Sequence, residues 1–318
     1  MKKSYWFVVS LCIVVFLVGC QENQVHDEII LPVGYIPSVQ FAPFYVGIAN
    51  GYYEDVGISL EMQYGFEIDG VSLVGSGELP FAVASGEQVV LAKDKGLPVI
   101  YVMNWYKDYP VGITVMKDGG IQELSELSDR VIGIPALQGA SYIAYKGFES
   151  TGTFDPDSIT LEVIGYNQVE MLSQGQVDAA VIYITNTPVV LTSQGYDVVT
   201  FPISDYISLV GNGIIANQEV LENDPDLVSD FIQATWRAIE FVRDNPEQTY
   251  EICKDFVPNL EEQTVQYQVL LASIPLWSTN GGYSDAQAWA ATTQLVKRLD
   301  LVSDSITADE LFTNNFVK

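Results

Sequence analysis

The stretch at residues 77–96, GELPFAVASGEQVVLAKDKG, decides the fold class of this chain. Residues 81–84 form an apolar run typical of a buried strand, which Ser85-Gly86 interrupts. A helical run follows and ends at Gly96, and residues 98–103 predict the next strand. The stretch therefore predicts one βαβ unit of an α/β fold, with a polar turn whose backbone N–H groups can face a ligand.

The same pattern returns at residues 175–195, GQVDAAVIYITNTPVVLTSQG. A glycine turn precedes an apolar strand at residues 179–184, a polar break follows at residues 185–187, and a glycine closes the apolar run after it. The strands before the two units also end alike, at Gly34 and Gly133. The repeat predicts two similar α/β lobes, each built round one copy of the same half-sheet.

The N-terminus has the pattern of an export signal rather than of a folded element. Two lysines precede an apolar run at residues 5–18, and the letters LVGC close the segment at Cys20. This pattern predicts a signal peptide at residues 1–19, a diacylated Cys20 and a tether at residues 20–28. An uncleaved membrane anchor is the alternative, although the apolar core is short for a spanning helix. We therefore expect a lipid-anchored protein on the extracytoplasmic face of the cell membrane.

The remaining chain exceeds the size at which one hydrophobic core usually suffices. We assign residues 29–111 and 208–318 to lobe one and residues 112–207 to lobe two, so that two crossings join the lobes. From residue 214 onward we expect helices, the first long one beginning at Asp224-Pro225, an N-cap followed by proline at the first helical position. This helical tail is expected to pack on lobe one.

The charge balance excludes two kinds of partner. The chain carries 14 Lys and Arg against 41 Asp and Glu. Such an acidic surface repels nucleic acid and anionic lipid headgroups, so we expect no nucleic-acid partner and membrane contact through the N-terminal lipid alone. The acidic residues are dispersed along the chain, which favours a solvated surface over a cation store.

The cysteines indicate that the mature chain has no disulfide. Cys12 leaves with the signal, Cys20 carries the lipid, and Cys253 remains alone. We interpret Cys253 as a small buried hydrophobic residue rather than a nucleophile.

The inventory of reactive side chains favours a binding protein over an enzyme. The one histidine, His26, lies in the tether, which excludes Ser-His-Asp and Cys-His catalysis and histidine-ligated metal sites. The chain has neither a Walker-type loop nor a GxGxxG fingerprint, and we expect no metal and no cofactor. A surface-anchored hydrolase with a carboxylate pair stays open as an alternative, because 41 acidic residues always supply some pair.

If the lobes face each other, a ligand lies between them at the ends of the strands. The loops expected there are rich in Tyr, Trp, Phe, Asn and Ser, and none contains an arginine. An aromatic, largely neutral ligand suits them, because rings stack on rings while amides and hydroxyls bind heteroatoms. A sulfonate, nitrate or phosphate would lack its usual bidentate partner. The candidate ligand-binding residues are Tyr35, Phe41, Ser85, Gly86, Glu87, Trp105, Gly139, Ser141, Tyr166, Tyr183, Asn186 and Asn212.

Each candidate has a structural alternative. Trp105 either forms a platform for the ligand or packs under the hinge, and Phe41 either stacks on the ligand or begins a helix in the core. The same choice stays open for the tyrosines, since 18 tyrosines cannot all serve one site. Helix capping is the alternative for the small polar residues at the two strand-to-helix turns.

Several blocks of sequence resemble one family of binding proteins. These are GYIP at residues 34–37, FYVG at 44–47, GYYEDVGI at 51–58, the turn at 81–86, and GQVDAA at 175–180. With them the chain resembles the periplasmic substrate-binding proteins of ABC importers, in the family that includes nitrate, sulfonate and thiamine-pyrimidine binders. The resemblance covers nearly the whole mature chain. It implies the two-lobed type II periplasmic-binding-protein fold and an ABC permease partner, and we expect a monomer.

The resemblance also narrows the ligand. Thiamine-pyrimidine binders carry an Asp-Trp pair and a histidine in the first loop, where this chain has Gly34-Tyr35 and Phe41. The related pyrimidine synthases need an active-site histidine and cysteine, which this chain does not offer. The run at residues 34–45, with residues 64–67 and 84–88, is most similar to riboflavin-binding members. Riboflavin is the ligand this similarity implies, and a hydroxymethyl- or formylamino-pyrimidine precursor of thiamine is the alternative.

With riboflavin as the ligand, the candidate residues divide into two groups. Phe41, Tyr35 and Trp105 would stack on the ring system. The ring edge or the ribityl hydroxyls would be hydrogen-bonded by Ser85, Glu87, Ser141, Asn186 and Asn212.

Overall fold

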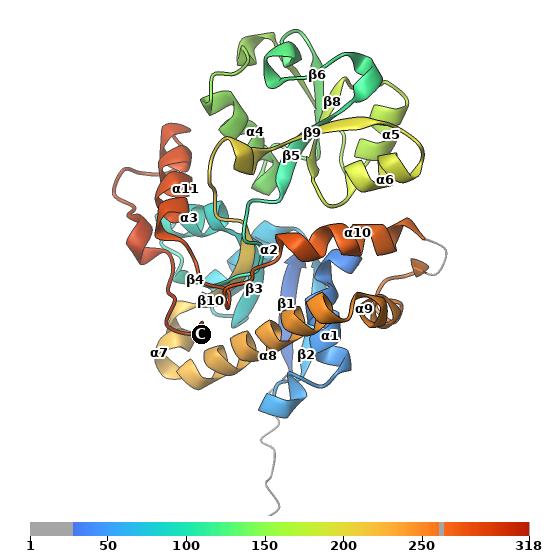
Figure 1. The fold of residues 1–318 in the computed structure, drawn as a ribbon. Coiled ribbons are helices and arrows are strands. Elements are labelled where there is room, and N and C mark those ends of the chain that lie inside the picture. Colours follow the sequence, from blue (N-terminus) through green and yellow to red (C-terminus); the bar gives the residue numbers. More distant parts are fainter. Residues whose placement is uncertain (1–27, 261–263, 318) are drawn as a thin grey trace, which may run out of the picture.

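The computed structural model describes residues 28–260 and 264–317, and it arranges them as two α/β lobes (Figure 1). The predicted signal peptide, the lipidated Cys20 and the tether up to residue 27 lie outside the described residues. Within the described ranges, no helix has the length and apolar character needed to cross a membrane.

The second lobe is built round one five-stranded sheet. Its strand order is β7-β6-β8-β5-β9, with β6 parallel to β7 and β8, and with β5 antiparallel to both of its neighbours. The strands are β5 (Val111–Met116), β6 (Val131–Ile134), β7 (Thr160–Val163), β8 (Ala179–Tyr183) and β9 (Val198–Pro202).

The first lobe repeats this order in two hydrogen-bonded parts. A parallel pair, β1 (Ile29–Gly34) and β2 (Leu60–Gly65), lies beside a sheet of order β3-β10-β4, in which β1 packs along β3. Those three strands are β3 (Phe81–Ser85), β4 (Val99–Asn104) and β10 (Asn212–Asn217). The spatial order β2-β1-β3-β10-β4 corresponds strand for strand to the second lobe. The predicted duplication is therefore present in the structure.

Strand β10 corrects one expectation from the sequence. Residue 214 lies in the middle of this strand and not in a helix, and the helices begin only at α7 (Gln218–Asn223). Every residue of β10 is buried, because the strand is flanked by β3 and β4 and covered on both faces. A short, continuously apolar strand of this kind has no alternation that would distinguish it from a buried helix. The error was in the element type, and the N-cap at Asp224 is confirmed, since its side chain accepts a hydrogen bond from the Leu227 N–H group.

Helices cover both faces of the two sheets (Figure 1). In the second lobe they are α4 (Gly139–Ser150), α5 (Gln168–Ser173) and α6 (Thr187–Ser193). In the first lobe they are α1 (Ala42–Ala49), α2 (Glu67–Gly75) and α3 (Gly86–Asp94), followed by α7 and the tail helices α8 (Pro225–Asp244), α9 (Pro246–Cys253), α10 (Val265–Ser273) and α11 (Ala286–Arg298).

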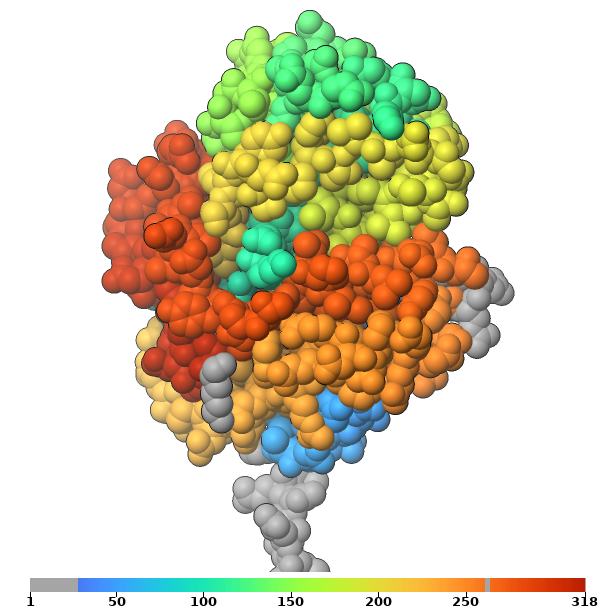
Figure 2. All heavy atoms as spheres, viewed as in Figure 1, coloured from blue at the N-terminus to red at the C-terminus, as the bar shows by residue number. Residues whose placement is uncertain are grey.

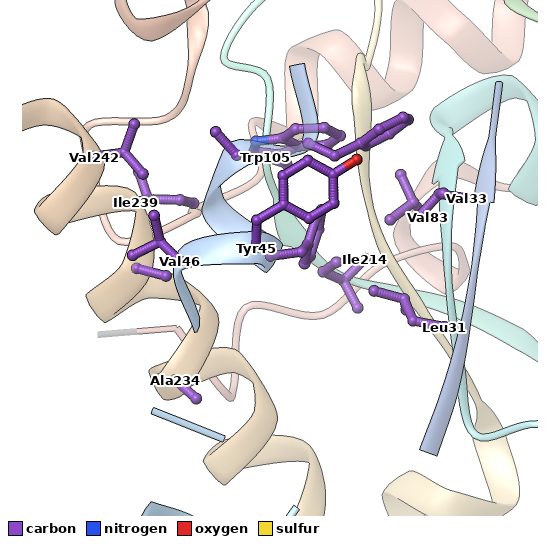
Figure 3. Packing of buried hydrophobic residues seen from close by; sticks show 14 of the residues in the cluster. Leu31, Val33, Tyr45, Val46, Val83, Trp105, Ile214, Ala234, Ile239 and Val242 are labelled. Carbon is purple, nitrogen blue, oxygen red and sulfur yellow. The ribbon is translucent and has the colours of Figure 1, made fainter. Parts of the chain in front are cut away.

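The core of the first lobe lies between its sheet and the helices α1 and α8 (Figure 3). Val33 from β1, Val83 from β3 and Ile214 from β10 face Val46 of α1 and Ile239 of α8. All of these side chains are at most 3% exposed. Burial of this apolar surface, at roughly 25 cal/mol per Å², is what holds the long tail helix to the sheet.

The tail packs on the first lobe, as expected, but it also reaches the second. Helix α10 packs against α6, and α11 packs against both α3 and α4 (Figure 1). Figure 2 shows the orange and red tail lying against the green and yellow lobe as well. Leu295 of α11 belongs to the hydrophobic core of the second lobe. The two lobes are therefore in contact through the tail as well as through the two crossings. The division of the chain at residues 111–112 and 207–208 stays a prediction.

Candidate ligand-binding site

A cavity of about 630 Å³ lies between the lobes. Its walls come from the segments that follow β1, β2, β3 and β4 in the first lobe and β6, β7 and β8 in the second. Loops at the carboxyl ends of strands form ligand sites in open α/β sheets, because the helix N-termini converge there. The volume is within the usual range of about 300–1,000 Å³ for sites that enclose a small organic ligand.

The cavity wall is aromatic and amide-rich. None of the described residues that line it is a lysine, arginine or histidine, and Glu67 is the one carboxyl among them. The aromatic lining residues are Tyr35, Phe41, Phe66, Trp105, Tyr106, Tyr142, Tyr166 and Tyr183. The amide lining residues are Gln40, Gln88, Gln138, Gln168, Asn186 and Asn212. Such a wall suits an uncharged ligand with an aromatic ring and several heteroatoms.

Tyr35 is held in an unusual backbone conformation at the mouth of the cavity. Its φ angle is 127°, and its N–H group donates a hydrogen bond of 2.8 Å to the carbonyl oxygen of Gly65. Its ring meets the edge of Tyr166 from the second lobe, with 4.9 Å between the ring centroids, and its hydroxyl accepts a hydrogen bond from Asn186 at 3.5 Å. A non-glycine residue in this region costs about 1–3 kcal/mol, a strain that concentrates at functional sites.

Phe41 and Trp105 lie side by side in the wall of the cavity. Their ring centroids are 5.8 Å apart, and Trp105 also packs edge-on to Phe44 at 5.2 Å and stacks on Trp277 at 6.2 Å with the planes inclined by 29°. Trp105 lines the cavity, yet only 2% of it is exposed. The two interpretations of Trp105 are therefore compatible, because its ring borders the cavity and also packs against Phe41 in the core.

The second lobe contributes three predicted residues from its strand-to-helix turns. Gly139 begins α4 with a φ angle of 70°, which favours glycine, and Ser141 follows in the first turn. Asn186 occupies the corresponding position before α6. All three line the cavity. These turns of the second lobe therefore border the cavity, and their contact with a ligand stays a prediction.

Three hydrogen bonds hold the lobes together round the cavity. The Gln40 side-chain amide donates to the Thr185 hydroxyl at 2.7 Å, and both side chains are buried. The Tyr183 hydroxyl donates to the Asn212 Oδ1 atom at 3.2 Å. The hydroxyl of Tyr109, a residue packed in the core of the second lobe, donates to Glu87 Oε2 of the first lobe at 3.0 Å. These bonds and the contact of Tyr35 with Tyr166 define a closed arrangement of the lobes.

Ser85, Gly86 and Glu87 do not line the cavity but lie behind its wall. The side chains of Ser85 and Glu87 have no exposed surface. Gly86 is packed so closely on Val210 that an added Cβ atom would lie 2.4 Å from the Val210 Cβ atom. Direct hydrogen bonds from Ser85 or Glu87 to a ligand in this cavity are therefore blocked by Glu67 and Gln88, which do line it.

Glu67 and Glu87 meet at the hydroxyl of Ser85. The Ser85 Oγ atom is 2.5 Å from Glu67 Oε1 and 2.6 Å from Glu87 Oε1, and the Ser85 N–H group also donates to Glu67 Oε1. The Tyr109 hydroxyl lies 3.0 Å from Glu87 Oε2. Burial and the nearby Glu87 carboxyl raise the pKa of Glu67 to about 7, and burial likewise raises the pKa of Glu87.

Glu67, Gln40 and Gln88 line the cavity but are not among the residues predicted from the sequence. Glu67 begins α2 just after the end of β2, so it lies in a strand-to-helix turn. Ligand-binding residues were predicted in such turns after other strands, but not in this one. Gln40 and Gln88 each lie beside a predicted residue, and only the side-chain direction decides that they reach the cavity. Within the described residues, no three His, Cys, Asp or Glu side chains form a group that could hold a metal ion.

With this geometry in view, the chain can be compared with known proteins. The family model described as "NMT1/THI5 like" matches residues 38–249. The chain belongs to this family. That membership agrees with the resemblance inferred from the sequence blocks.

Three relatives illustrate the range of this family. A riboflavin-binding protein, RibY, from Chloroflexus aurantiacus is 31% identical over 92% of this chain and 86% of its own length. A formylaminopyrimidine-binding protein from Halalkalibacterium halodurans is 22% identical over 98% of this chain and 99% of its own. A 4-amino-5-hydroxymethyl-2-methylpyrimidine phosphate synthase from Legionella pneumophila is 22% identical over 93% and 94%. Both binding proteins and synthases are thus similar to this chain.

Solved structures confirm the predicted fold. The periplasmic aliphatic sulphonate-binding protein SsuA from Escherichia coli matches with a TM-score of 0.73 at 13% identity, over 90% of this chain and 92% of that one. The ligand-binding component of an ABC-type import system from Staphylococcus aureus matches with a TM-score of 0.68 at 16% identity, over 91% and 98%. The chain has the α/β fold of periplasmic binding proteins.

Proposed function

We propose that this chain is the substrate-binding lipoprotein of an ABC importer, which captures riboflavin outside the cell and delivers it to a membrane permease. The observation that carries this proposal is the cavity between the lobes, whose wall is aromatic and amide-rich and has no basic side chain among the described residues. An uncharged tricyclic ring with polar edges is complementary to that wall. The 31% identity to a protein named as riboflavin-binding supports the choice of ligand.

The geometry of the carboxyl pair favours binding over hydrolysis. A glycosidase needs two carboxyl groups that both reach the bond to be cleaved. Here only Glu67 borders the cavity, while Glu87 is fully buried and shares the hydroxyl of Ser85 with it. The pair therefore lies to one side of any ligand and cannot flank a scissile bond.

The remaining cysteine also favours a binding protein over a synthase. Cys253 has no exposed surface and lies in the core of the first lobe. Burial raises the pKa of its thiol to about 12, so the thiol stays protonated and unreactive at neutral pH. The chain's one histidine, His26, lies outside the described residues.

In this proposal the ring system lies over Phe41 and beneath the pair formed by Tyr35 and Tyr166. Ser141, Asn186 and Asn212 bind the heteroatoms from both lobes, and closure of the lobes encloses the ligand. Support for this placement comes from the lining of the cavity and from the edge-on contact of Tyr35 with Tyr166 across its mouth.

The deciding experiment is a titration of residues 28–318, expressed without the lipid, with riboflavin. We expect saturable quenching of both tryptophan and flavin fluorescence, since the flavin lies close to Trp105. Tyr166→Ala should weaken binding about 5- to 150-fold, because about 1–3 kcal/mol of stacking is lost and each 1.4 kcal/mol is tenfold. Tyr166 is 52% exposed, so the substitution leaves the fold intact.

The matched control is Tyr196→Ala, which removes an exposed tyrosine of the same lobe that does not line the cavity. Equal affinities of the two variants would contradict the placement of the ring. A thermal shift with formylaminopyrimidine and none with riboflavin would show that riboflavin is the wrong ligand. It would favour the ligand for which the Halalkalibacterium halodurans relative is named. Silence with both, together with hydrolysis of a glycoside, would refute the binding role.

A further inference from the structure

The contacts of Ser85 require a proton on one of the two carboxyl groups. A serine hydroxyl has one hydrogen, and it can donate to one oxygen only. Its oxygen nevertheless lies 2.5 Å from Glu67 Oε1 and 2.6 Å from Glu87 Oε1, both within hydrogen-bond distance. If both carboxyls were ionised, one of these contacts would place two lone pairs against each other. One carboxyl proton, donated to the Ser85 oxygen, satisfies both contacts.

The surroundings favour one net negative charge on the pair and not two. Glu67 begins α2 and Glu87 lies in the first turn of α3, where the helix dipoles stabilise a negative charge. No ion pair among the described residues joins either carboxyl to a lysine or an arginine. A second charge in this buried place would therefore have no counter-ion.

The titratable groups that face the pair are all tyrosines. They approach from β4, from the segment between β4 and β5, from the loop after β7 and from β8. Burial raises the pKa of each hydroxyl, so that all four stay neutral near pH 7. They are Tyr101, Tyr109, Tyr166 and Tyr183.

The pair presents one hydrogen-bond acceptor to the cavity. Both bonds between Glu67 and Ser85 use Oε1, and Glu67 lines the cavity. The other oxygen, Oε2, is thus the one left for a ligand. It accepts a hydrogen bond whether the shared proton lies on Glu67 or on Glu87.

We propose that Glu67 and Glu87 share one proton through Ser85 and act as a single monoanionic acceptor at the cavity wall, which selects an uncharged ligand carrying an N–H or O–H donor. Glu67 is the residue that touches the ligand, and Glu87 is a positioning residue that acts through it. The inference rests on the proposed role of the cavity and names the chemistry of the ligand edge that binds there.

Ligand binding should depend on the shared proton. Loss of the proton leaves two negative charges on either side of one hydroxyl, and an aromatic ligand that covers Glu67 must then bury the second charge without a counter-ion. The two carboxyls titrate as a pair, so the relevant ionisation belongs to both residues. Replacing either carboxyl by an amide should remove this ionisation, and with it the dependence of ligand binding on pH.

The pair is tested first without any ligand. Carbon NMR of protein labelled at the glutamate carboxyl carbons should reveal a carboxyl that titrates near pH 7, well above the usual value of about 4.3. That titration should be lost in Glu67→Gln and in Glu87→Gln, and kept in the control Glu61→Gln, which changes an exposed glutamate of β2. If every carboxyl of the wild-type protein titrates below about pH 5.5, the shared proton is refuted.

The role in selection is tested with riboflavin at pH 6 and pH 8. A ligand that needs a proton with a pKa near 7 binds about tenfold more weakly at pH 8 than at pH 6. The wild-type protein and Glu61→Gln should behave in this way, whereas Glu67→Gln and Glu87→Gln should bind equally at the two pH values. Equal wild-type affinities at pH 6 and pH 8 would overturn the selective role while leaving riboflavin as the ligand.

The failure of the proposed function has a different signature. In that case no variant binds riboflavin at either pH, and the carboxyl titration, which needs no ligand, still decides whether the pair shares a proton. The wild-type measurements need no substitution, so they stand even where a variant fails to fold.

Discussion

The buried hydrogen bond between Gln40 and Thr185 should control closure of the lobes, and Thr185→Val tests this. The bond is 2.7 Å long, and Gln40 and Thr185 are 7% and 1% exposed. Valine has nearly the shape of threonine but no hydroxyl, so the Gln40 amide hydrogen remains buried without its acceptor. Thr185 itself does not line the cavity, which separates closure from direct contact with the ligand.

The size of the effect follows from the burial of the bond. Leaving a buried amide hydrogen unpaired costs about 1–3 kcal/mol. In an open form water pairs with Gln40, so the cost falls on the closed form alone. The ratio of closed to open protein should therefore fall about 5- to 150-fold. Because the ligand is enclosed only in the closed form, the apparent Kd should rise by a similar factor.

The assay is a fluorescence titration with riboflavin, combined with small-angle X-ray scattering of the ligand-free protein. The control is Thr200→Val, which removes a 2.8 Å hydrogen bond to Thr114 inside the second lobe. This variant should lose stability but keep the wild-type Kd. If Thr185→Val and Thr200→Val have the same Kd and the same radius of gyration, the bond does not control closure.

Three further predictions concern stability and are measured by urea denaturation. The free energy of unfolding should fall by about 2 kcal/mol as pH rises from 5 to 7, because the raised pKa of Glu67 makes the folded state hold a proton that the unfolded state releases; Glu67→Gln should flatten this slope. Gly86→Ala should destabilise the protein by about 1–3 kcal/mol, since the new methyl group would overlap Val210; no loss would contradict that close contact. Asp224→Ala should cost about 1 kcal/mol, because the 3.1 Å bond from Leu227 N–H is lost, and an unchanged midpoint would show that α8 does not depend on its cap.

The duplication could be predicted from the sequence because it is written in local patterns. Each copy has an apolar strand, a polar break and a helix that a glycine ends. These features can be recognised from neighbouring residues alone, without knowledge of contacts between distant parts of the chain. The polar break at residues 185–187 also predicted a turn at Asn186, which borders the cavity. What the patterns do not contain is pairing across the sheet. Strand β10 was missed for that reason, since its antiparallel partners lie more than a hundred positions earlier in the chain.

The sequence indicated which turns border the candidate site, but not which residue of each turn faces the cavity. A turn after a strand brings two or three residues near the ligand, and only the packing decides which of them points into the cavity. Gly86 packs directly on Val210, and this close contact turns Ser85 and Glu87 inward and leaves Gln88 at the wall. Glu67 then fills the place that the sequence analysis assigned to Glu87. The two carboxyls come from separate turns, so no spacing in the sequence could predict that they meet.

The pair formed by Glu67 and Glu87 lies where the lobes touch, so its charge should affect closure of the lobes. The single hydrogen of the Tyr109 hydroxyl has two acceptors, Glu87 Oε2 at 3.0 Å in the first lobe and the carbonyl oxygen of Ala140 at 3.1 Å in the second. Tyr109 itself packs in the hydrophobic core of the second lobe, so its bond to Glu87 is the one that crosses between the lobes. A second negative charge on the pair draws that hydrogen toward Glu87, because hydrogen bonds to a charged acceptor are the stronger ones. Ionisation of the pair should therefore strengthen this contact between the lobes, while it adds a second buried charge beside the ligand.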